Sequence, residues 1–161
     1  MAKNSGENLR IERVVSATDD ARALVTELEE ELSAEYPPEN RHGLNLDRLF
    51  RPEVAFFIAY RVGEPIGCGG IAFENNLAEL KRMYVRPSAR GSGVGDAILE
   101  RLSEEARSRG FARLVLETGD AQGLALRFYQ RNGFVRCGAF GQYAAMPAHC
   151  IVRSVFFERE I

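Results

Sequence analysis

Hydrophobic and polar positions near the start of the chain follow first a strand period and then a helix period. Residues 9–15 alternate and predict a strand. Ser16, Thr18 and Asp19 supply capping side chains ahead of a helix predicted over 19–35. The apolar positions of that helix recur at the helical spacing: Ala21, Leu24, Val25 and Leu28. The chain is therefore expected to begin with a strand and a long amphipathic helix.

The middle of the chain reads mainly as strands. Paired prolines in "EYPPEN" end the first helix, and "LNLDRLF" (44–50) predicts a short second one. Residues 54–73 predict two strands joined by a tight turn at Gly63-Glu64-Pro65, and 78–85 predict a third.

Helices and strands alternate in the second half. A helix is predicted over 93–108, where Val94, Ile98, Leu102 and Ala106 lie four apart, and Gly110 ends it. Then follow a buried strand (112–118), a helix (121–132) ended by Asn132-Gly133, and two closing strands in 133–140 and 151–160. The predicted order is β-α-(α)-β-β-β-α-β-α-β-β.

The composition is that of an ordinary folded protein, with 161 residues, 45% hydrophobic, 27% charged and a net charge of −2. These values predict a single domain, 1–161, with its core at about 9–160. The charge balance does not favour nucleic acid as a partner, and no apolar run approaches the ~20 residues of a membrane span. We expect no nucleic acid and no membrane partner, while a homodimer stays open.

The cysteines and histidines do not indicate a metal site. Cys68, Cys137 and Cys150 form no CxxC spacing, so neither a disulfide framework nor a zinc site is expected, and no metal cofactor is predicted. His42 and His149 read as surface residues. "MAKNSGENLRIERV" contains no apolar core for a secretory signal, and a reducing cytoplasm fits best.

The stretch "RPSARGSGVGDAILERL" (86–102) carries the clearest chemical signal. Glycines follow a predicted strand and lead into a predicted helix, whose first amides have no internal partner. Glycine lets a phosphate approach the backbone, and the helix macrodipole favours an anion there. A P-loop is excluded because no Lys-Ser or Lys-Thr follows, and the dinucleotide pattern fails because Asp96 stands at its third glycine. A glycine-rich turn without a ligand is the alternative.

The pattern R-x-x-G-x-G, at Arg90, Gly93 and Gly95, resembles the coenzyme A pyrophosphate loop of the GNAT N-acetyltransferase superfamily. A second stretch, "ETGDAQGLALRFYQRNGF" (117–134), resembles the later family motif N-x-x-A-x-x-x-Y before G-F. Gln122, Ala125 and Tyr129 occupy its positions, with Gln replacing Asn. Seven residues make nearly two helical turns, so Gln122 and Tyr129 share a face.

The resemblance implies an α/β fold: a mixed, mostly antiparallel central sheet flanked by helices, in which parallel strands 4 and 5 splay apart. It implies that acetyl-CoA is the cosubstrate and enters between these strands. The cofactor-binding residues it implies are backbone groups of Met83, Tyr84 and Val85 for the pantetheine, the loop Arg90, Gly91, Ser92, Gly93, Val94 and Gly95 for the pyrophosphate, and Gln122. An amide near Val85 would polarise the thioester carbonyl.

The implied reaction is direct attack of a primary amine on acetyl-CoA. Glu79 matches a glutamate that is the general base in some members; the alternative is an ion pair with Lys81 or Arg82 on the sheet surface. Strand alternation predicts that Glu79, Lys81, Met83 and Val85 share one face. Tyr129 matches the general acid for the sulfur, and its alternative is a core tyrosine.

The acceptor is a small-molecule or peptide amine whose identity the sequence leaves open. The resemblance places its pocket at 33–50 and 140–150, where Phe140, Tyr143 and His149 are candidates. The acidic set Glu27, Glu29, Glu30, Glu31 and Glu35 reads as a solvated helix face, or alternatively attracts a cationic amine. The rival function is a non-catalytic acyl-CoA-binding sensor or partner module with the same fold.

Overall fold

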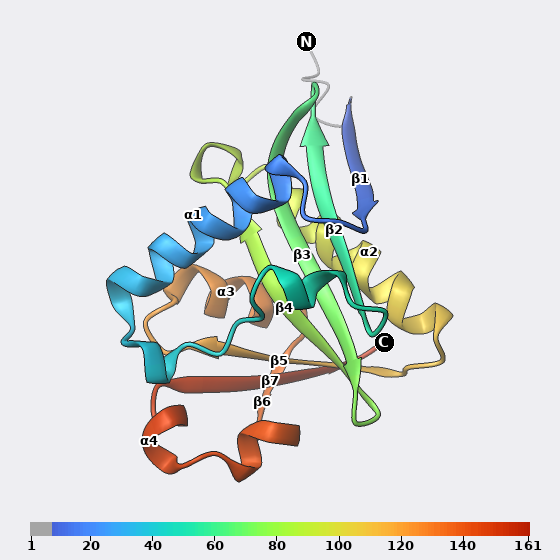
Figure 1. Cartoon of the computed structure of the whole chain (residues 1–161). Helices are drawn as coiled ribbons and strands as arrows, with labels where there is room; N and C mark the ends of the chain where they lie inside the picture. The colour runs from blue at the N-terminus through green and yellow to red at the C-terminus, as the bar shows by residue number, and fades with distance from the viewer. Residues whose placement is uncertain (1–7) are drawn as a thin grey trace.

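A computed structural model describes residues 8–161 and contains one seven-stranded sheet with helices on both faces (Figure 1). The strand order is β1-β2-β3-β4-β5-β7-β6, and β4 and β5 form its parallel pair. The strands are β1 (Leu9–Val14), β2 (Val54–Arg61), β3 (Glu64–Glu74), β4 (Leu77–Val85), β5 (Arg113–Gly119), β6 (Val135–Cys137) and β7 (Ser154–Glu160). The helices are α1 (Asp19–Glu35), α2 (Val94–Ser108), α3 (Gly123–Arg131) and α4 (Ala148–Ile151), with short 3-10 helices η1 (Pro38–Asn40), η2 (Asp47–Phe50), η3 (Pro87–Ala89) and η4 (Gly141–Ala145). The predicted fold class is confirmed, and the predicted elements occur in the predicted order. The structure adds the short helix α4 between β6 and β7, and the helix predicted over 44–50 is the 3-10 helix η2.

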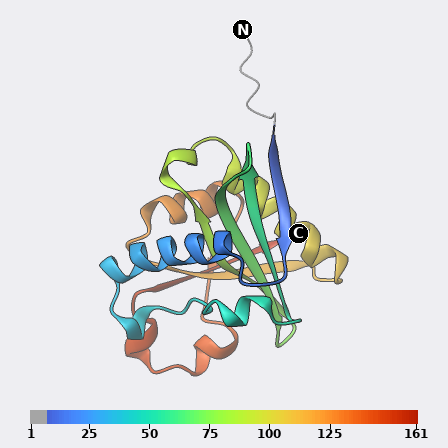
Figure 2. The ribbon, with the colours of Figure 1, turned by 45° about the horizontal axis from the view of Figure 1, so that its top comes forward.

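Helix α1 begins and faces the core as its sequence indicates. The Thr18 hydroxyl accepts a 3.2 Å hydrogen bond from the Ala21 N–H, which satisfies one of the free amides of the first turn. The buried side chains of α1 pack with Phe56 and Ile58 of β2. Helix α2 packs with Phe57 on the opposite face, so α1 and α2 enclose the sheet from two sides (Figure 2).

The hairpin between β2 and β3 differs from the prediction by two residues. Its turn is Val62-Gly63, both with positive φ (51° and 78°), while Glu64 and Pro65 already belong to β3. Arg61 pairs with Glu64 across it. A two-residue turn with two positive φ angles matches the right-handed twist of the strands, which explains why the chain turns earlier than Glu64-Pro65.

Strands β4 and β5 pair over a short length and then separate. Their paired residues are Ala78 with Leu114 and Glu79 with Val115, and beyond these the strands run in clearly different directions (Figure 1). The separation leaves an edge of β4 uncovered from Leu80 onward. This is the splay that the resemblance implies.

A β-bulge in β4 overturns the prediction that Glu79, Lys81, Met83 and Val85 share one face. The pairing with β3 shifts between Cys68 and Gly70, and Arg82 has φ 56°. Met83 and Val85 pack with the α2 side of the core, whereas Arg82 pairs with Glu29 of α1. The extra residue reverses the alternation after Lys81, because two consecutive side chains then point to the same side.

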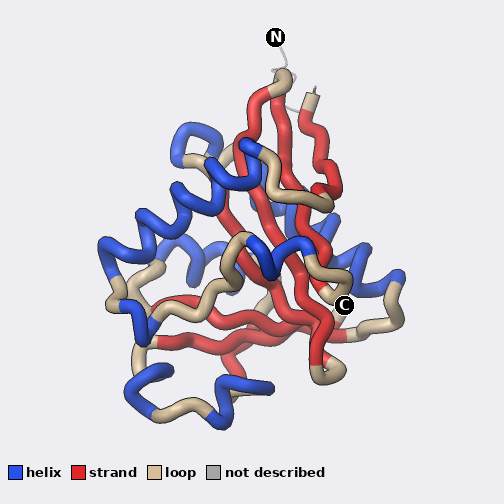
Figure 3. The backbone as a smooth tube through the Cα atoms, in the orientation of Figure 1, coloured by secondary structure: helices blue, strands red, loops and turns tan. Residues whose placement is uncertain are grey.

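The closing strands are shorter than predicted. β6 covers Val135–Cys137 at the sheet edge, and β7 lies between β5 and β6. The connection between them holds η4 and α4, and the connection from α1 to β2 crosses the sheet face near the separated strands (Figure 3). These two connections are the segments available to enclose a ligand there.

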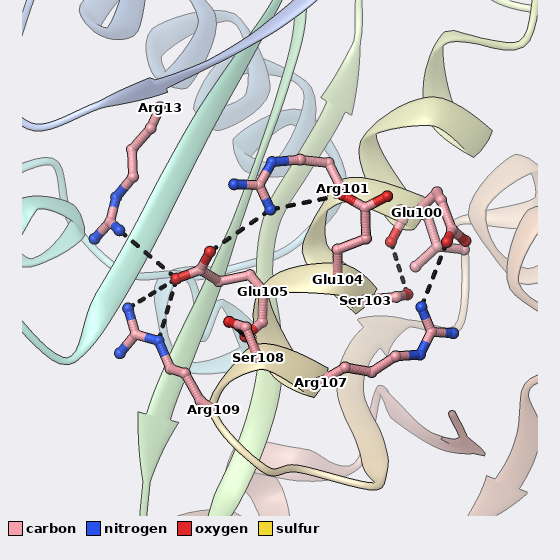
Figure 4. Close-up of polar contacts among 10 residues, drawn as sticks. Arg13, Glu100, Arg101, Ser103, Glu104, Glu105, Arg107, Ser108 and Arg109 are labelled. Atoms are coloured by element: carbon pink, nitrogen blue, oxygen red, sulfur yellow. Dashed lines mark hydrogen bonds and ion pairs between the residues drawn. The ribbon is translucent and has the colours of Figure 1, made fainter.

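An ion-pair network on α2 ties this helix to β1 on the side away from α1 (Figure 4). The Glu105 carboxylate lies 3.6 Å from Arg13 of β1, 3.6 Å from Arg101 and 3.0 Å from Arg109. Three guanidiniums therefore share one carboxylate, which links β1 to two turns of α2. Within residues 8–161, no helix is both long and apolar enough to cross a bilayer.

Candidate active site

A cleft opens where β4 and β5 separate. It receives residues from α1, from the α1–β2 connection, from both strands and from α3. They are Leu28, Leu32, Tyr36, Asn40, Arg41, His42, Gly43, Leu80, Lys81, Arg82, Met83, Leu116, Glu117, Thr118, Gly119, Gln122, Ala125 and Tyr129. Apolar side chains from α1 and β5 face charged ones from β4, so the cleft can hold a ligand with both characters.

The glycine loop between β4 and α2 leaves its backbone open. Gly91 and Gly93 have φ angles of 77° and 85°, and a Cβ added to either would meet no atom within 4 Å. Gly93 precedes α2 as its N-cap and provides no side-chain cap, so the first amides of α2 lack a side-chain acceptor. Gly95 serves packing instead, because its Cβ would lie 3.1 Å from the Phe128 ring of α3. The loop therefore fits a pyrophosphate.

Arg90 lies on the α1 side of this loop. Its Nε donates a 2.8 Å hydrogen bond to the Val85 carbonyl, and its second guanidinium nitrogen lies 2.9 Å from the Glu31 carboxylate. Ser92 donates a 2.6 Å hydrogen bond to the Ala89 carbonyl. Both side chains brace the loop, and the glycine and Val94 amides are the groups left for an anion.

The residues expected to bind the pantetheine lie along the uncovered edge. Met83, Tyr84 and Val85 come after the last β4–β5 pair. Gln122 lines the cleft immediately before α3, and its side chain makes no capping hydrogen bond. An extended ligand could therefore pair with β4 where β5 does not.

Tyr129 lies on α3 at the cleft wall, in contact with the rings of Phe128, Phe134 and Phe157. Burial raises the pKa of its hydroxyl well above the usual value, and no other cause contributes to the shift. The hydroxyl is therefore protonated at neutral pH, as a proton donor must be.

Glu79 is held in a buried ion pair behind the cleft. Its carboxylate lies 2.9 Å from the Lys81 ammonium and accepts a 2.6 Å hydrogen bond from the Tyr143 hydroxyl. Lys81 also donates to Tyr143 (2.7 Å) and to the His42 carbonyl (3.3 Å). Glu79 lines a separate small hollow with Phe140 and Tyr143 rather than the cleft. The expected ion pair between Glu79 and Lys81 is thus present. It is largely buried and does not lie on an open sheet surface, since 13% of the Glu79 side chain is exposed.

Glu117, to which the sequence analysis assigned no role, is the acidic residue among those lining the cleft. It accepts a 2.5 Å hydrogen bond from the Ser154 hydroxyl. Burial raises the pKa of this carboxyl, against the lowering effects of the Ser154 hydrogen bond and of the nearby His42 and Lys81. The available signal was an acidic residue directly after the apolar run Leu114-Val115-Leu116, twelve positions before Tyr129.

The end of the cleft formed by the α1–β2 connection is closed by its contacts with the β6–β7 connection. Asn40 Nδ2 donates to the carbonyls of His149 (2.9 Å) and Cys150 (3.3 Å), and His42 Nε2 donates to Cys150 O (2.7 Å). Of the expected pocket residues, Phe140 and Tyr143 pack behind the cleft against Phe156, and His149 is exposed outside it. None of the three lines this cleft, and Phe140 and Tyr143 line the separate hollow with Glu79, so a role for them in acceptor binding stays a prediction.

The acidic face of α1 is occupied by arginines. Arg86 binds Glu27 through hydrogen bonds that lower the pKa of that carboxyl. Arg82 and Arg41 share Glu29, Arg90 pairs with Glu31, and Arg153 with Glu35. Four of the five carboxylates therefore fasten α1 to neighbouring segments, which leaves little free charge to attract a cationic amine.

Known proteins resemble this chain in sequence and in fold. The family model described as "Acetyltransferase (GNAT) family" matches residues 21–134. An IAA acetyltransferase of Azospirillum brasilense is 38% identical over 156 residues, which cover 96% of this chain and 99% of the relative. The crystal structure of a protein assigned as an acyl-CoA N-acyltransferase, from Klebsiella pneumoniae, has a TM-score of 0.74 at 29% identity over 94% of this chain and 97% of that one. PaiA N-acetyltransferase of Thermoplasma acidophilum, in complex with coenzyme A, has a TM-score of 0.67 at 17% identity over 94% and 99%, a likeness of fold.

Proposed function

Because the chain belongs to the GNAT family of acetyltransferases and is an enzyme of that kind, we propose that it transfers an acetyl group from acetyl-CoA directly to the nitrogen of an amine. One observation carries the proposal: the uncovered edge of β4 leads from the open glycine loop to a cleft lined by Glu117 and Tyr129. The cleft thus joins an anion site to a proton acceptor and a proton donor.

Acetyl-CoA supplies the thioester. The amides of residues 91–95 would bind its pyrophosphate, and the backbone of Met83, Tyr84 and Val85 its pantetheine arm, with Gln122 beside it. The absence of a side-chain cap on α2 and the early end of β4–β5 pairing support both assignments. In the same proposal, the backbone amide of Val85 donates a hydrogen bond to the thioester carbonyl and stabilises the oxyanion that forms there.

For the base we propose Glu117, directly or through a water. An ammonium acceptor must lose a proton before its nitrogen can attack, and Glu117 faces the cleft with a raised pKa suited to proton uptake. Glu79, the base expected from the resemblance, has its carboxylate engaged by Lys81 and Tyr143. We assign it the role of holding Lys81 in place.

Tyr129 is the proposed proton donor. Glu117 takes one proton from the ammonium before attack. As the nitrogen–carbon bond forms and the carbon–sulfur bond breaks, Tyr129 gives its proton to the leaving thiolate. The second proton on the nitrogen then passes to the Tyr129 phenolate through water, which leaves a neutral amide and a protonated tyrosine. Its protonated, buried hydroxyl at the cleft wall supports this role.

Coenzyme A release with a panel of amines, read by a thiol reagent, tests the function. Acetylated amine should appear by mass spectrometry in a one-to-one ratio with free thiol. Tight acetyl-CoA binding without turnover on any amine would favour the rival sensor. The proposed compartment is the cytoplasm, supported by the three cysteines being free thiols.

A further inference from the structure

We propose that the acceptor carries a carboxylate beside its amine and that Arg41 is the residue that recognises this carboxylate. The inference rests on the proposed acetyltransfer and names the class of its second substrate: small amino acids and related amine-carboxylates. It comes from the charges that line the acceptor end of the cleft.

Arg41 is a cation with unused donors. It lies in the α1–β2 connection and lines the cleft, with 25% of its side chain exposed. Its Nε is shielded from solvent and has no hydrogen-bond partner within residues 8–161. Its ion pair with Glu29 is long, at 3.6 Å. A shielded donor without an acceptor is costly, so an anion at this place would be bound favourably.

Arg82 lies beside Arg41 and adds a second charge. The β4 bulge turns it toward α1, where its Nε donates a 2.7 Å hydrogen bond to the Leu44 carbonyl and its guanidinium pairs with Glu29. Its side chain is 5% exposed, and one guanidinium nitrogen is buried without a partner. Gly43 packs against this guanidinium and leaves no room for a side chain.

The two arginines share a single carboxylate. Arg41 and Arg82 both pair with Glu29, while Lys81 pairs with Glu79. Glu117 makes no ion pair with either arginine within residues 8–161, so one guanidinium at the cleft wall has no carboxylate of its own. A carboxylate on the acceptor would neutralise it, and Arg41, the more exposed of the two, is the one it can reach.

The rest of the cleft fits the other half of such a ligand. Glu117, the acid of the lining, would face the ammonium while Arg41 faces the carboxylate. A polyamine would bring a second cation toward Arg41, which is unfavourable. The hydrogen bonds from Asn40 and His42 to the β6–β7 connection close this end, which favours a small acceptor over a folded protein.

Matched acceptors test the inference. The probes are L-amino acids, each with its carboxamide and its decarboxylated amine, assayed by thiol release. We expect kcat/KM to be at least tenfold higher for the acids. Arg41→Gln should reduce this preference about tenfold or more, mainly through KM, and Arg41→Lys should retain part of it. The matched control is Arg51→Gln, at an exposed arginine outside the cleft, which should keep the wild-type preference.

Calorimetry provides a second readout that does not need turnover. The CoA-loaded protein is titrated with N-acetylglycine, N-acetyl-L-leucine and N-acetyl-L-phenylalanine, and with the amide of each. We expect at least one acid to bind tenfold more tightly than its amide, and Arg41→Gln to abolish the difference.

The outcomes separate the two proposals. Amides or decarboxylated amines that react as well as the acids would leave acetyltransfer standing and overturn the carboxylate inference. If Arg41→Gln lowers kcat/KM equally for the acids and for their amides, the carboxylate inference is also overturned. If no amine is acetylated, the proposed function fails. The calorimetry then tests the carboxylate inference by itself. Equal binding of the acids and their amides, or no binding of either, would reject the inference.

Discussion

The Tyr36 hydroxyl, at the end of α1, accepts a 2.9 Å hydrogen bond from the backbone N–H of Ala121, just after β5. Its ring can approach β5 because residue 119 is a glycine, and a Cβ there would overlap the hydroxyl. Both Tyr36 and Gly119 line the cleft. This contact therefore sets the distance between α1 and the separated end of β5.

Gly119→Ala should destabilise the protein by about 1–3 kcal/mol, because the new methyl group forces the buried Tyr36 ring to move. Urea unfolding followed by circular dichroism measures the change. Gly138→Ala is the matched control, since a Cβ at Gly138 would meet no atom within 4 Å. If the two variants have equal free energies of unfolding, Tyr36 and α1 can move away from β5 without loss of stability.

Gly93→Ala should weaken coenzyme A binding about tenfold or more, because its Cβ would occupy the space left for the pyrophosphate. Calorimetry with coenzyme A measures the affinity. Gly110→Ala is the control for backbone strain: Gly110 has nearly the same φ (83° against 85°) and equally open surroundings, but it lies beyond the other end of α2. If both variants bind alike, the loop is not the pyrophosphate site.

Tyr129→Phe should lower kcat by about 10²–10⁴-fold and leave acetyl-CoA affinity largely unchanged. The substitution keeps the ring that packs against Phe134 and Phe157 and removes the proton. Steady-state kinetics on a good acceptor, with calorimetry for acetyl-CoA, provide the two numbers. An unchanged kcat would show that Tyr129 packs in the core and is not the proton donor.

The pH dependence of kcat/KM should distinguish Glu117 from Glu79. In the wild type the rate rises with pH as Glu117 loses its proton, on a limb above the usual carboxyl range because its pKa is raised. Glu117→Gln should abolish this limb. Glu79→Gln removes a negative charge that raises the Glu117 pKa, so the limb should move to lower pH and persist. The opposite pattern would make Glu79 the base.

Glu117→Gln should also stabilise the fold at high pH. A carboxyl with a raised native pKa contributes most stability below its unfolded pKa and loses that contribution as pH rises through the native pKa. The variant has no such loss, so the difference in unfolding free energy should be small at pH 4 and grow to a plateau at high pH. Urea unfolding across this range measures it, and a difference that shrinks with pH would contradict the raised pKa.

The sequence determined the elements and their order. The 19–35 helix was predicted at its observed bounds because local signals fix it: capping side chains before Asp19, a helical apolar stripe and paired prolines after it. The open backbone of the glycine loop also follows from local sequence, since Gly91 and Gly93 adopt positive φ angles and Gly93 offers no capping side chain; the anion site proposed there stays a prediction. A local sequence pattern is sufficient to predict an element when the interactions that form it are between residues close in sequence.

Tertiary structure decided which side chains meet. The bulge at Arg82 depends on pairing with β3, so alternation along β4 could not reveal that Lys81 and Arg82 turn to the same side. The burial that raises the Glu117 pKa comes from segments folded around β5, and Tyr143 captures Glu79 across 64 positions of sequence. Long-range packing controls burial and ion pairing, and these two properties distinguish Glu117, the proposed proton acceptor, from Glu79, whose carboxylate is paired with Lys81.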